Sequence, residues 1–282
     1  MFTFIDGLTY KTSIQPKPDP IGTPVVNDLP PSKSTIDVRE VQQFNALQGE
    51  WWNPVGKMKP LHRINPVRLA YIKQQIALNF RIDNKSPKFL AGLTILDIGC
   101  GGGLLCEPLS KLGATVTGID PGGANIEIAR AHSNLSNLTI DYQITTAEDL
   151  VKTSAQFDIV LAMEVIEHVS NVNMFVEAAT KLVKPQGLFI GSTLNRTLRS
   201  FALAIIGAEY VLRWLPKGTH AWDKFVTPQE FQTELEVNGF DRCEATGMSY
   251  SPFSDTWNQT RDTSVNYFIS AQKTGKVVAN HI

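Results

Sequence analysis

The sequence lacks several features that would place it in a specialised class of protein. It has only three cysteines, at positions 100, 106 and 243, and they form neither a zinc-binding spacing nor an even disulfide set. No apolar run approaches the roughly 18 residues that a membrane-spanning helix needs. The net charge is −1, so bulk charge does not predict a nucleic-acid partner. These absences leave an ordinary globular protein in a reducing compartment.

Arginine is missing from the beginning of the chain, where the first one is Arg39. This segment contains six prolines between positions 16 and 31, and it also carries Asp6, Asp19 and Asp28. A mitochondrial presequence is rich in arginine and poor in acids, so the targeting signal here is weak. We expect residues 1–36 to form a disordered leader or targeting segment and residues 274–282 to form a tail.

A glycine-rich turn organises the rest of the chain. The apolar run that ends at Ile98 contains Asp97 and is followed by Gly99, Gly101, Gly102 and Gly103, then by a helical pattern. Glycines let a backbone approach a ligand closely, and the next helix offers free N–H groups. The spacing is G-x-G-G-G rather than the G-x-G-x-x-G of a dinucleotide site.

Asp120 strengthens the prediction of a nucleotide-like ligand. It ends the next apolar run, about 20 residues after the first glycine, where an acid can accept hydrogen bonds from both ribose hydroxyls. The alternative is a tight turn followed by a helix-capping aspartate. NAD and S-adenosylmethionine (SAM) both remain possible on these features alone.

Strand and helix patterns alternate between residues 94 and 193. Candidate strands cover 94–98, 115–119, 138–142, 157–162 and 188–193, with helical segments near 104–112, 123–132 and 172–183. This alternation predicts an α/β, Rossmann-like, doubly wound and mostly parallel sheet, with the ligand at the carboxyl ends of the strands. Gly99, Asp120 and Met163 all fall at such ends.

Two further positions are candidates for binding charged groups. Asn65-Pro66 resembles a helix start, which places Arg68 in the first turn, where a cation needs a partner. An arginine fork suits a carboxylate, and the alternative is a surface ion pair. If the chain turns helical after Met163, then Glu164, Glu167 and His168 share one face and can hold a divalent metal. The alternative is that these acids cap a helix or line a cleft, and His168 can also act as a proton acceptor.

Residues 196–222 are predicted to form an insertion. The run from Ser200 to Ala208 carries no charge, while Arg196, Arg199, Arg213 and Lys217 flank it. This composition is typical of a helix that lies in a membrane interface, and a buried helix that covers the active site is the alternative.

Six motifs resemble one enzyme family in order along the chain. They are W-W at 51–52, K-P-L-H-R-I-N-P at 59–66, E-V-I-E-H at 164–168, S-T-L-N-R at 192–196, P-K-G-T-H at 216–220 and V-N-Y at 265–267. With D-I-G-C-G-G-G at 97–103 and G-I-D at 118–120, they resemble the ubiquinone-biosynthesis O-methyltransferases of the SAM-dependent class I fold. The similarity covers roughly residues 38–273.

The resemblance implies a function and a set of site residues. It implies one methyltransferase domain over residues 37–273, with a seven-stranded sheet that ends in an antiparallel C-terminal hairpin. It implies SAM bound by Arg68, Gly99, Gly101, Asp120 and Met163, and Mg²⁺ on Glu164, Glu167 and His168. The implied substrate is a polyprenylated catechol, methylated with His168 as a candidate catalytic base.

The resemblance also implies a location and partners. The enzyme is expected to be peripheral on the matrix side of the mitochondrial inner membrane, or membrane-associated in a bacterial cytoplasm, beside other ubiquinone-biosynthesis proteins. Two other functions fit the same sequence features: a methyltransferase for another phenolic molecule, and a non-catalytic SAM-fold subunit of a biosynthetic complex. An NAD dehydrogenase is disfavoured because the last glycine spacing of its fingerprint is missing.

Overall fold

A computed structural model of the chain describes residues 34–37, 41–42, 48–200, 224–251 and 254–274. Most of the predicted leader 1–36, most of the predicted insertion 196–222 and all but the first residue of the predicted tail 274–282 lie outside these residues. Thr35 is buried at 3% exposure and bonds Glu148 through its backbone N–H and its hydroxyl, so packing is already established at this position.

The described residues alternate between strands and helices up to residue 194. The strands are β1 (Thr94–Ile98), β2 (Thr115–Asp120), β3 (Asp141–Ile144), β4 (Phe157–Met163), β5 (Val183–Leu194), β6 (Phe240–Ser251), β7 (Thr256–Thr260) and β8 (Asn266–Lys273). The helices are η1 (Gln48–Glu50), α2 (Lys59–Phe80), α3 (Cys106–Lys111), α4 (Gly123–Leu135), α5 (Ala147–Val151), η2 (Ile166–His168), α6 (Val172–Lys181), α7 (Leu198–Ser200) and α8 (Pro228–Val237).

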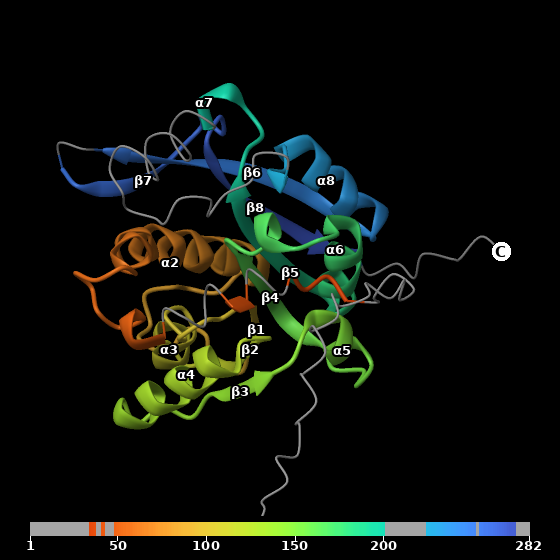
Figure 1. Cartoon of the computed structure of the whole chain (residues 1–282). Coiled ribbons are helices and arrows are strands. Elements are labelled where there is room, and N and C mark those ends of the chain that lie inside the picture. The colour runs from red at the N-terminus through yellow and green to blue at the C-terminus, as the bar shows by residue number, and fades with distance from the viewer. Residues whose placement is uncertain (1–33, 38–40, 43–47, 201–223, 252–253, 275–282) are drawn as a thin grey trace, which may run out of the picture. The chain divides into compact units, whose positions relative to one another are not determined.

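The strands form one sheet in the order β3-β2-β1-β4-β5-β8-β6-β7 (Figure 1). Strands β3, β2, β1, β4 and β5 are parallel, and β8, β6 and β7 add on through antiparallel pairings. The predicted fold class is therefore confirmed. In the described residues the sheet has eight strands, one more than the predicted seven, because the C-terminal region supplies three antiparallel strands rather than a two-stranded hairpin.

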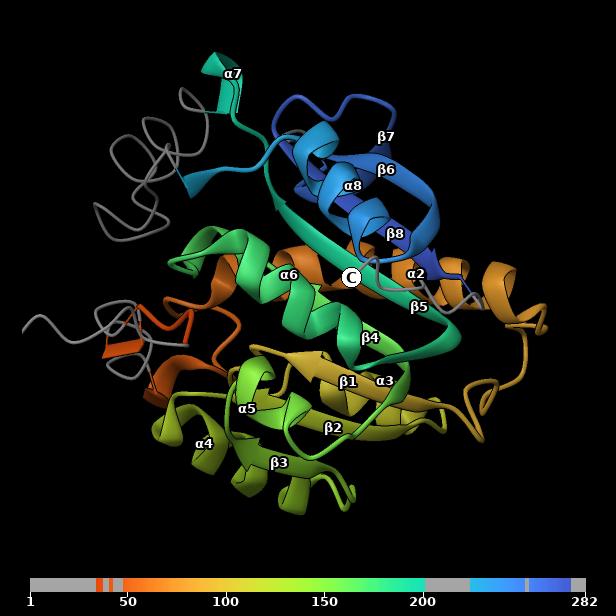
Figure 2. The ribbon, with the colours of Figure 1, turned by 90° about the vertical axis from the view of Figure 1, so that its right-hand side faces the viewer.

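Side chains alternate between two hydrophobic cores, one on each face of the sheet. On β4, Ile159 and Leu161 join the core beneath α2, α3 and α4, while Val160 and Ala162 join the core beneath α5, α6 and α8. Figure 2 shows α6 and α8 in front of the sheet and α2 behind it. This alternation follows from the two-residue period of a strand and buries the central strands of the sheet on both faces.

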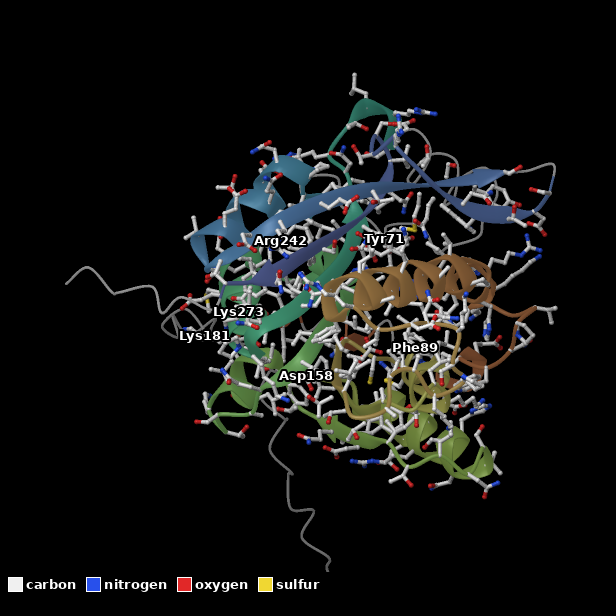
Figure 3. The ribbon with its side chains drawn as sticks, turned by 180° about the vertical axis from the view of Figure 1, so that it is seen from behind. Tyr71, Phe89, Asp158, Lys181, Arg242 and Lys273 are labelled. Carbon is white, nitrogen blue, oxygen red and sulfur yellow. The ribbon has the colours of Figure 1, made fainter. Side chains whose placement is uncertain are left out.

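Helix α2 is attached to the sheet by large buried side chains. Tyr71 lies between α2 and the sheet, where its ring stacks on Phe268 with 4.3 Å between centroids (Figure 3). Ile72 and Ile76 are fully buried on the same helix. Burying each such side chain contributes roughly 1.5 to 3 kcal/mol, so α2 is held firmly against the sheet.

The strand order reverses between β1 and β4, and this is where a ligand is expected to bind in such a sheet. Among the residues that the structure describes, no helix has both the length and the apolar composition needed to cross a bilayer.

Candidate functional site

The glycine turn after β1 accommodates a close contact made by the chain itself. Gly99, Gly101 and Gly103 have φ angles of +68°, +53° and +86°, which residues other than glycine rarely adopt. A Cβ built on Gly101 would lie 2.1 Å from Cη2 of Trp51, and one on Gly102 would lie 2.6 Å from Cγ of the same indole. At these two positions the glycines therefore make room for an aromatic side chain.

Asp120 ends β2 beside this turn and is a buried hydrogen-bond acceptor. Its Oδ2 accepts the N–H of Gly101 at 3.1 Å, and its Oδ1 accepts the N–H of Gly122 at 2.7 Å and Nδ2 of Asn125 at 3.2 Å. Burial raises the pKa of Asp120, and these three hydrogen bonds oppose the rise. The alternative of a helix-capping aspartate is wrong, because the N-cap of α4 is Gly122.

Arg68 lies well inside α2 rather than in its first turn. The predicted helix start at Asn65-Pro66 is wrong, because α2 begins at Lys59 and contains Pro66 in its interior. Pro60 is the proline in the first turn that helix starts favour. Asn65-Pro66 has the same sequence pattern but lies inside the helix. The dipole argument for Arg68 therefore does not apply.

Arg68 nevertheless reaches the predicted site. Its guanidinium is buried and donates from Nη2 to the carbonyl oxygen of Met163 at 3.2 Å. Burial lowers the pKa of Arg68, and the nearby carboxylates of Glu164, Asp97 and Glu167 oppose that change. The structure thus brings the predicted pair Arg68 and Met163 together, as it does the pair Gly101 and Asp120.

The chain does not turn helical directly after Met163. Glu164 has a left-handed φ of +57°, and only a short 3-10 turn, η2, follows from Ile166 to His168. The condition under which three side chains would share one helical face is therefore not met. The carboxylate of Glu164 instead accepts the hydroxyl of Ser192 on β5 at 2.7 Å.

Glu167 is the most deeply buried member of this group, at 3% exposure. Its Oε2 accepts the hydroxyl of Thr193 at 2.8 Å. Burial and the neighbouring charge of Glu164 raise the pKa of Glu167 to about 7, while His168 opposes the rise. Protonation of this carboxyl is therefore easier than for a solvent-exposed glutamate.

The two carboxylates bond to opposite faces of β5, because Ser192 and Thr193 are consecutive residues of that strand. Ser192 lies on the same face of β5 as Leu188 and Ile190, which belong to the core beneath α2. Thr193 lies on the opposite face with Phe189, which belongs to the core beneath α6 and α8. Within the described ranges, no three His, Cys, Asp or Glu side chains converge closely enough to hold a metal ion.

Sequence reasoning assigned no role to three residues that the structure places in or beside the site. Asp97 is buried next to the glycine turn, where it accepts the thiol of Cys106 at 3.2 Å, and burial raises its pKa to about 6. Trp51 and Asn125 join the glycine turn to Asp120. The W-W motif was a usable signal for Trp51, but nothing in the pattern indicated which surface its indole covers.

The chain is similar to known methyltransferases over most of its length. The sequence profile of the methyltransferase domain family matches residues 68–244. The chain is 50% identical to the ubiquinone biosynthesis O-methyltransferase of Brucella anthropi over 242 residues, which cover 86% of this chain and 98% of that protein. It is 51% identical to the protein of the same name from Bartonella bacilliformis, with the same coverage.

Solved structures share the fold at much lower identity. The magnesium protoporphyrin IX methyltransferase of Synechocystis, determined with bound S-adenosylhomocysteine (SAH), aligns with a TM-score of 0.59 and 18% identity. The alignment covers 83% of this chain and 97% of that one. The plantazolicin methyltransferase BamL aligns with a TM-score of 0.57 and 16% identity, over 84% of this chain and 98% of that one.

Proposed function

Because the chain belongs to the ubiquinone biosynthesis O-methyltransferases, and is thus a SAM-dependent O-methyltransferase, we propose that it methylates catechol-type polyprenyl intermediates of ubiquinone. The observation that carries this proposal is the 50% identity to a relative of that name over 86% of this chain and 98% of that protein.

We assign SAM to the carboxyl ends of β1, β2 and β4. Asp120 would accept the ribose hydroxyls, and the turn containing Gly99 and Gly101 would lie against the methionine part. Arg68 would bind the methionine carboxylate beside Met163. Its Nε is buried without a hydrogen-bond partner among the described residues, so it supports this assignment by leaving one donor available for a ligand.

We propose that Glu164, Glu167 and His168 hold Mg²⁺. The donor types suit Mg²⁺, which is bound through one or two carboxylates while keeping several waters, but Glu164 and Glu167 must turn away from Ser192 and Thr193 before the three side chains can converge. Glu167 carries an unfavourable burial and a like-charge neighbour, both of which a cation would offset. A divalent cation bound to a catechol would lower the pKa of its hydroxyl.

The chain's own contribution to methyl transfer is placement and proton removal. The methyl group of a sulfonium is already activated, so the protein must align a catechol oxygen with the S–CH₃ bond, which alone supplies several kcal/mol. We propose His168, which is half-buried at the end of η2 beside Glu167, as the group that accepts the hydroxyl proton when it is not a metal ligand.

We further propose that the enzyme works at a membrane surface beside other ubiquinone-biosynthesis proteins, because a polyprenylated substrate partitions into lipid. The apolar run 200–208 and its flanking cations support a surface contact, and Leu198, two residues before this run, is 82% exposed. A location on the matrix side of the mitochondrial inner membrane rests on the resemblance alone, whereas the relatives named above are bacterial. Flotation with vesicles that contain anionic lipid tests the surface contact.

The decisive experiment is methyl transfer from labelled SAM to a short-chain prenylated dihydroxybenzoate, with EDTA and then with added Mg²⁺. We expect EDTA to abolish the activity and Mg²⁺ to restore it. Glu164→Ala and Glu167→Ala should abolish the restored activity, whereas Glu177→Ala, which removes an exposed carboxylate from α6, should not.

Each part of the proposal has its own contrary result. Activity that is indifferent to EDTA removes the metal and leaves His168 as the base. An unprenylated catechol that is methylated as fast as the prenylated one indicates a different phenolic substrate. Binding of SAM without transfer to any catechol contradicts the proposed substrate class.

A further inference from the structure

A chain of three buried side chains leads from the W-W motif to the acid proposed to bind the ribose. The indole Nε1 of Trp51 donates to Oδ1 of Asn125 at 3.0 Å, and Nδ2 of Asn125 donates to Oδ1 of Asp120 at 3.2 Å. Trp51 is 6% exposed and Asn125 is 2% exposed, so neither hydrogen bond is exchanged for water at low cost.

An amide is the side chain that this middle position requires. Asn125 must accept a hydrogen bond from an indole, which can only donate, and must donate one to a carboxylate, which can only accept. A carboxylate of the same shape would satisfy Trp51 but would repel Asp120. The two neighbours therefore fix the orientation of the Asn125 amide.

Trp51 is itself held in place from two sides. Its carbonyl oxygen lies 2.8 Å from Nε2 of His62 on α2, and its indole lies against Gly101 and Gly102. The N–H of Gly101 in turn donates to Oδ2 of Asp120. The indole of Trp51 is thus linked to the Asp120 carboxylate by two routes. One runs through the Asn125 amide and the other through the backbone N–H of Gly101.

Trp52 also contacts the glycine turn and His62, but through atoms of its own. Its Nε1 donates to the carbonyl oxygen of Gly102 at 3.0 Å, and its ring stacks on His132 with 3.5 Å between centroids. None of these contacts reaches Asp120 or Asn125. The two adjacent tryptophans therefore provide a matched pair for an experiment.

We propose that Trp51 and Asn125 are positioning residues that orient the carboxylate of Asp120 toward the ribose hydroxyls of SAM. This inference rests on the proposed role of Asp120. Oδ1 of Asp120 accepts one backbone donor, from Gly122, and one side-chain donor, from Asn125. These two hydrogen bonds fix the direction in which the carboxylate presents its remaining acceptor sites. Cofactor affinity should then depend on a tryptophan that belongs to the segment before the methyltransferase sheet.

Calorimetric titration with SAH and with its 2′,3′-dideoxyribose analogue tests the inference. We expect Asn125→Asp to weaken SAH binding about tenfold, because it replaces a hydrogen bond to the Asp120 carboxylate by like-charge repulsion. Trp51→Phe should weaken it about fivefold, because it removes the neutral hydrogen bond that orients Asn125. The analogue lacks the hydroxyls that Asp120 would accept, so the same variants should change its affinity less than about twofold. Trp52→Phe should affect both ligands equally.

Three results separate the possible failures. Equal weakening of both ligands by Trp51→Phe and Asn125→Asp, or no weakening of SAH, overturns the positioning role. Thermal unfolding shows whether either variant is misfolded. If one is, the variant at the other end of the Trp51–Asn125 hydrogen bond still tests the proposal. Asp120→Ala that binds SAH as tightly as the wild type instead overturns the ribose assignment itself, while methyl transfer to the prenylated catechol tests the enzyme's substrate separately.

Discussion

Ser192 and Glu164 bond to each other in both directions. The backbone N–H of Glu164 donates to both the carbonyl oxygen and the hydroxyl oxygen of Ser192, at 3.1 Å each, and the Ser192 hydroxyl donates to Oε1 of Glu164 at 2.7 Å. These bonds hold Glu164 at a φ of +57°, where a side chain costs about 1 to 2 kcal/mol. A strained residue at the carboxyl end of a parallel strand is typical of a functional site.

The strain predicts an unusual ranking of substitutions at Glu164. Both Glu164→Ala and Glu164→Gly remove the bond from Ser192 to the carboxylate, but only glycine relieves the left-handed conformation. We expect Glu164→Gly to be more stable to urea unfolding than Glu164→Ala by about 1 kcal/mol. Both variants should lose methyl transfer.

The exposed position Thr233 in the middle of α8 is the matched control. There, glycine should be less stable than alanine by about 1 kcal/mol, because the backbone is helical. The same ranking at Glu164 as at Thr233 would show that the left-handed conformation carries no strain.

A second prediction concerns the contact between Trp51 and the glycine turn. Gly102 is not among the glycines with positive φ, so alanine is excluded there only by the indole 2.6 Å from its Cβ. Gly102→Ala should destabilise the protein by about 1 to 3 kcal/mol, as overpacking does. Gly49→Ala, whose Cβ meets nothing within 4 Å, should change the free energy of unfolding by less than about 0.5 kcal/mol.

A double-mutant cycle identifies the cause of this cost. In a Trp51→Ala background, Gly102→Ala should cost less than in the wild type, because the opposing ring is gone. An unchanged cost in that background would mean that Gly102 is required for a reason other than the indole.

Much of the fold follows from local sequence patterns. Apolar runs at 94–98 and 157–162 predict β1 and β4 to within one residue, because buried parallel strands are nearly continuous apolar segments. Thr227-Pro228 with Glu230 predicts the start of α8, and the structure has the full capping box there. These signals lie within a few residues of the structure that they specify.

The rest of the site depends on relationships that local patterns do not contain. Asn65-Pro66 satisfies the rules for a helix start, yet packing of α2 on the sheet extends the helix back to Lys59. The conformation of Glu164 depends on Ser192, which is 28 positions away and in another strand. Whether Glu164 and Glu167 converge depends on which faces of β5 their partners occupy, so residue spacing alone could not decide it.

The capping box at α8 gives a third prediction. The side chain of Thr227 accepts the N–H of Glu230 at 3.2 Å, and the Glu230 carboxylate accepts the N–H of Thr227 at 2.9 Å. Thr227→Ala should lower the free energy of unfolding by about 1 kcal/mol. Thr227→Ser should retain most of the stability, and equal losses in urea unfolding for the two variants would show that the hydroxyl cap is not responsible.

The buried carboxyl of Asp97 gives a fourth prediction, which concerns pH. Burial raises its folded pKa to about 6, whereas an unfolded aspartate titrates near pH 4. Between these values the folded protein holds the extra proton, so this group reduces stability as the pH rises. Asp97→Asn should match the wild type near pH 4 and exceed its free energy of unfolding by roughly 2 to 3 kcal/mol at pH 7.

Asp158 is the control of opposite sign. Its pKa is lowered because Thr94 and Lys184 bond its carboxylate, which outweighs the effect of partial burial. A lowered folded pKa stabilises the protein above the unfolded pKa and loses this effect as the pH falls. Asp158→Asn should therefore be less stable than the wild type at pH 7, and the difference should shrink as the pH falls toward 3. Urea unfolding of both variants between pH 3 and pH 7 tests these two predictions. If Asp97→Asn gains the same stability at pH 4 and at pH 7, titration of Asp97 is not the source of the gain.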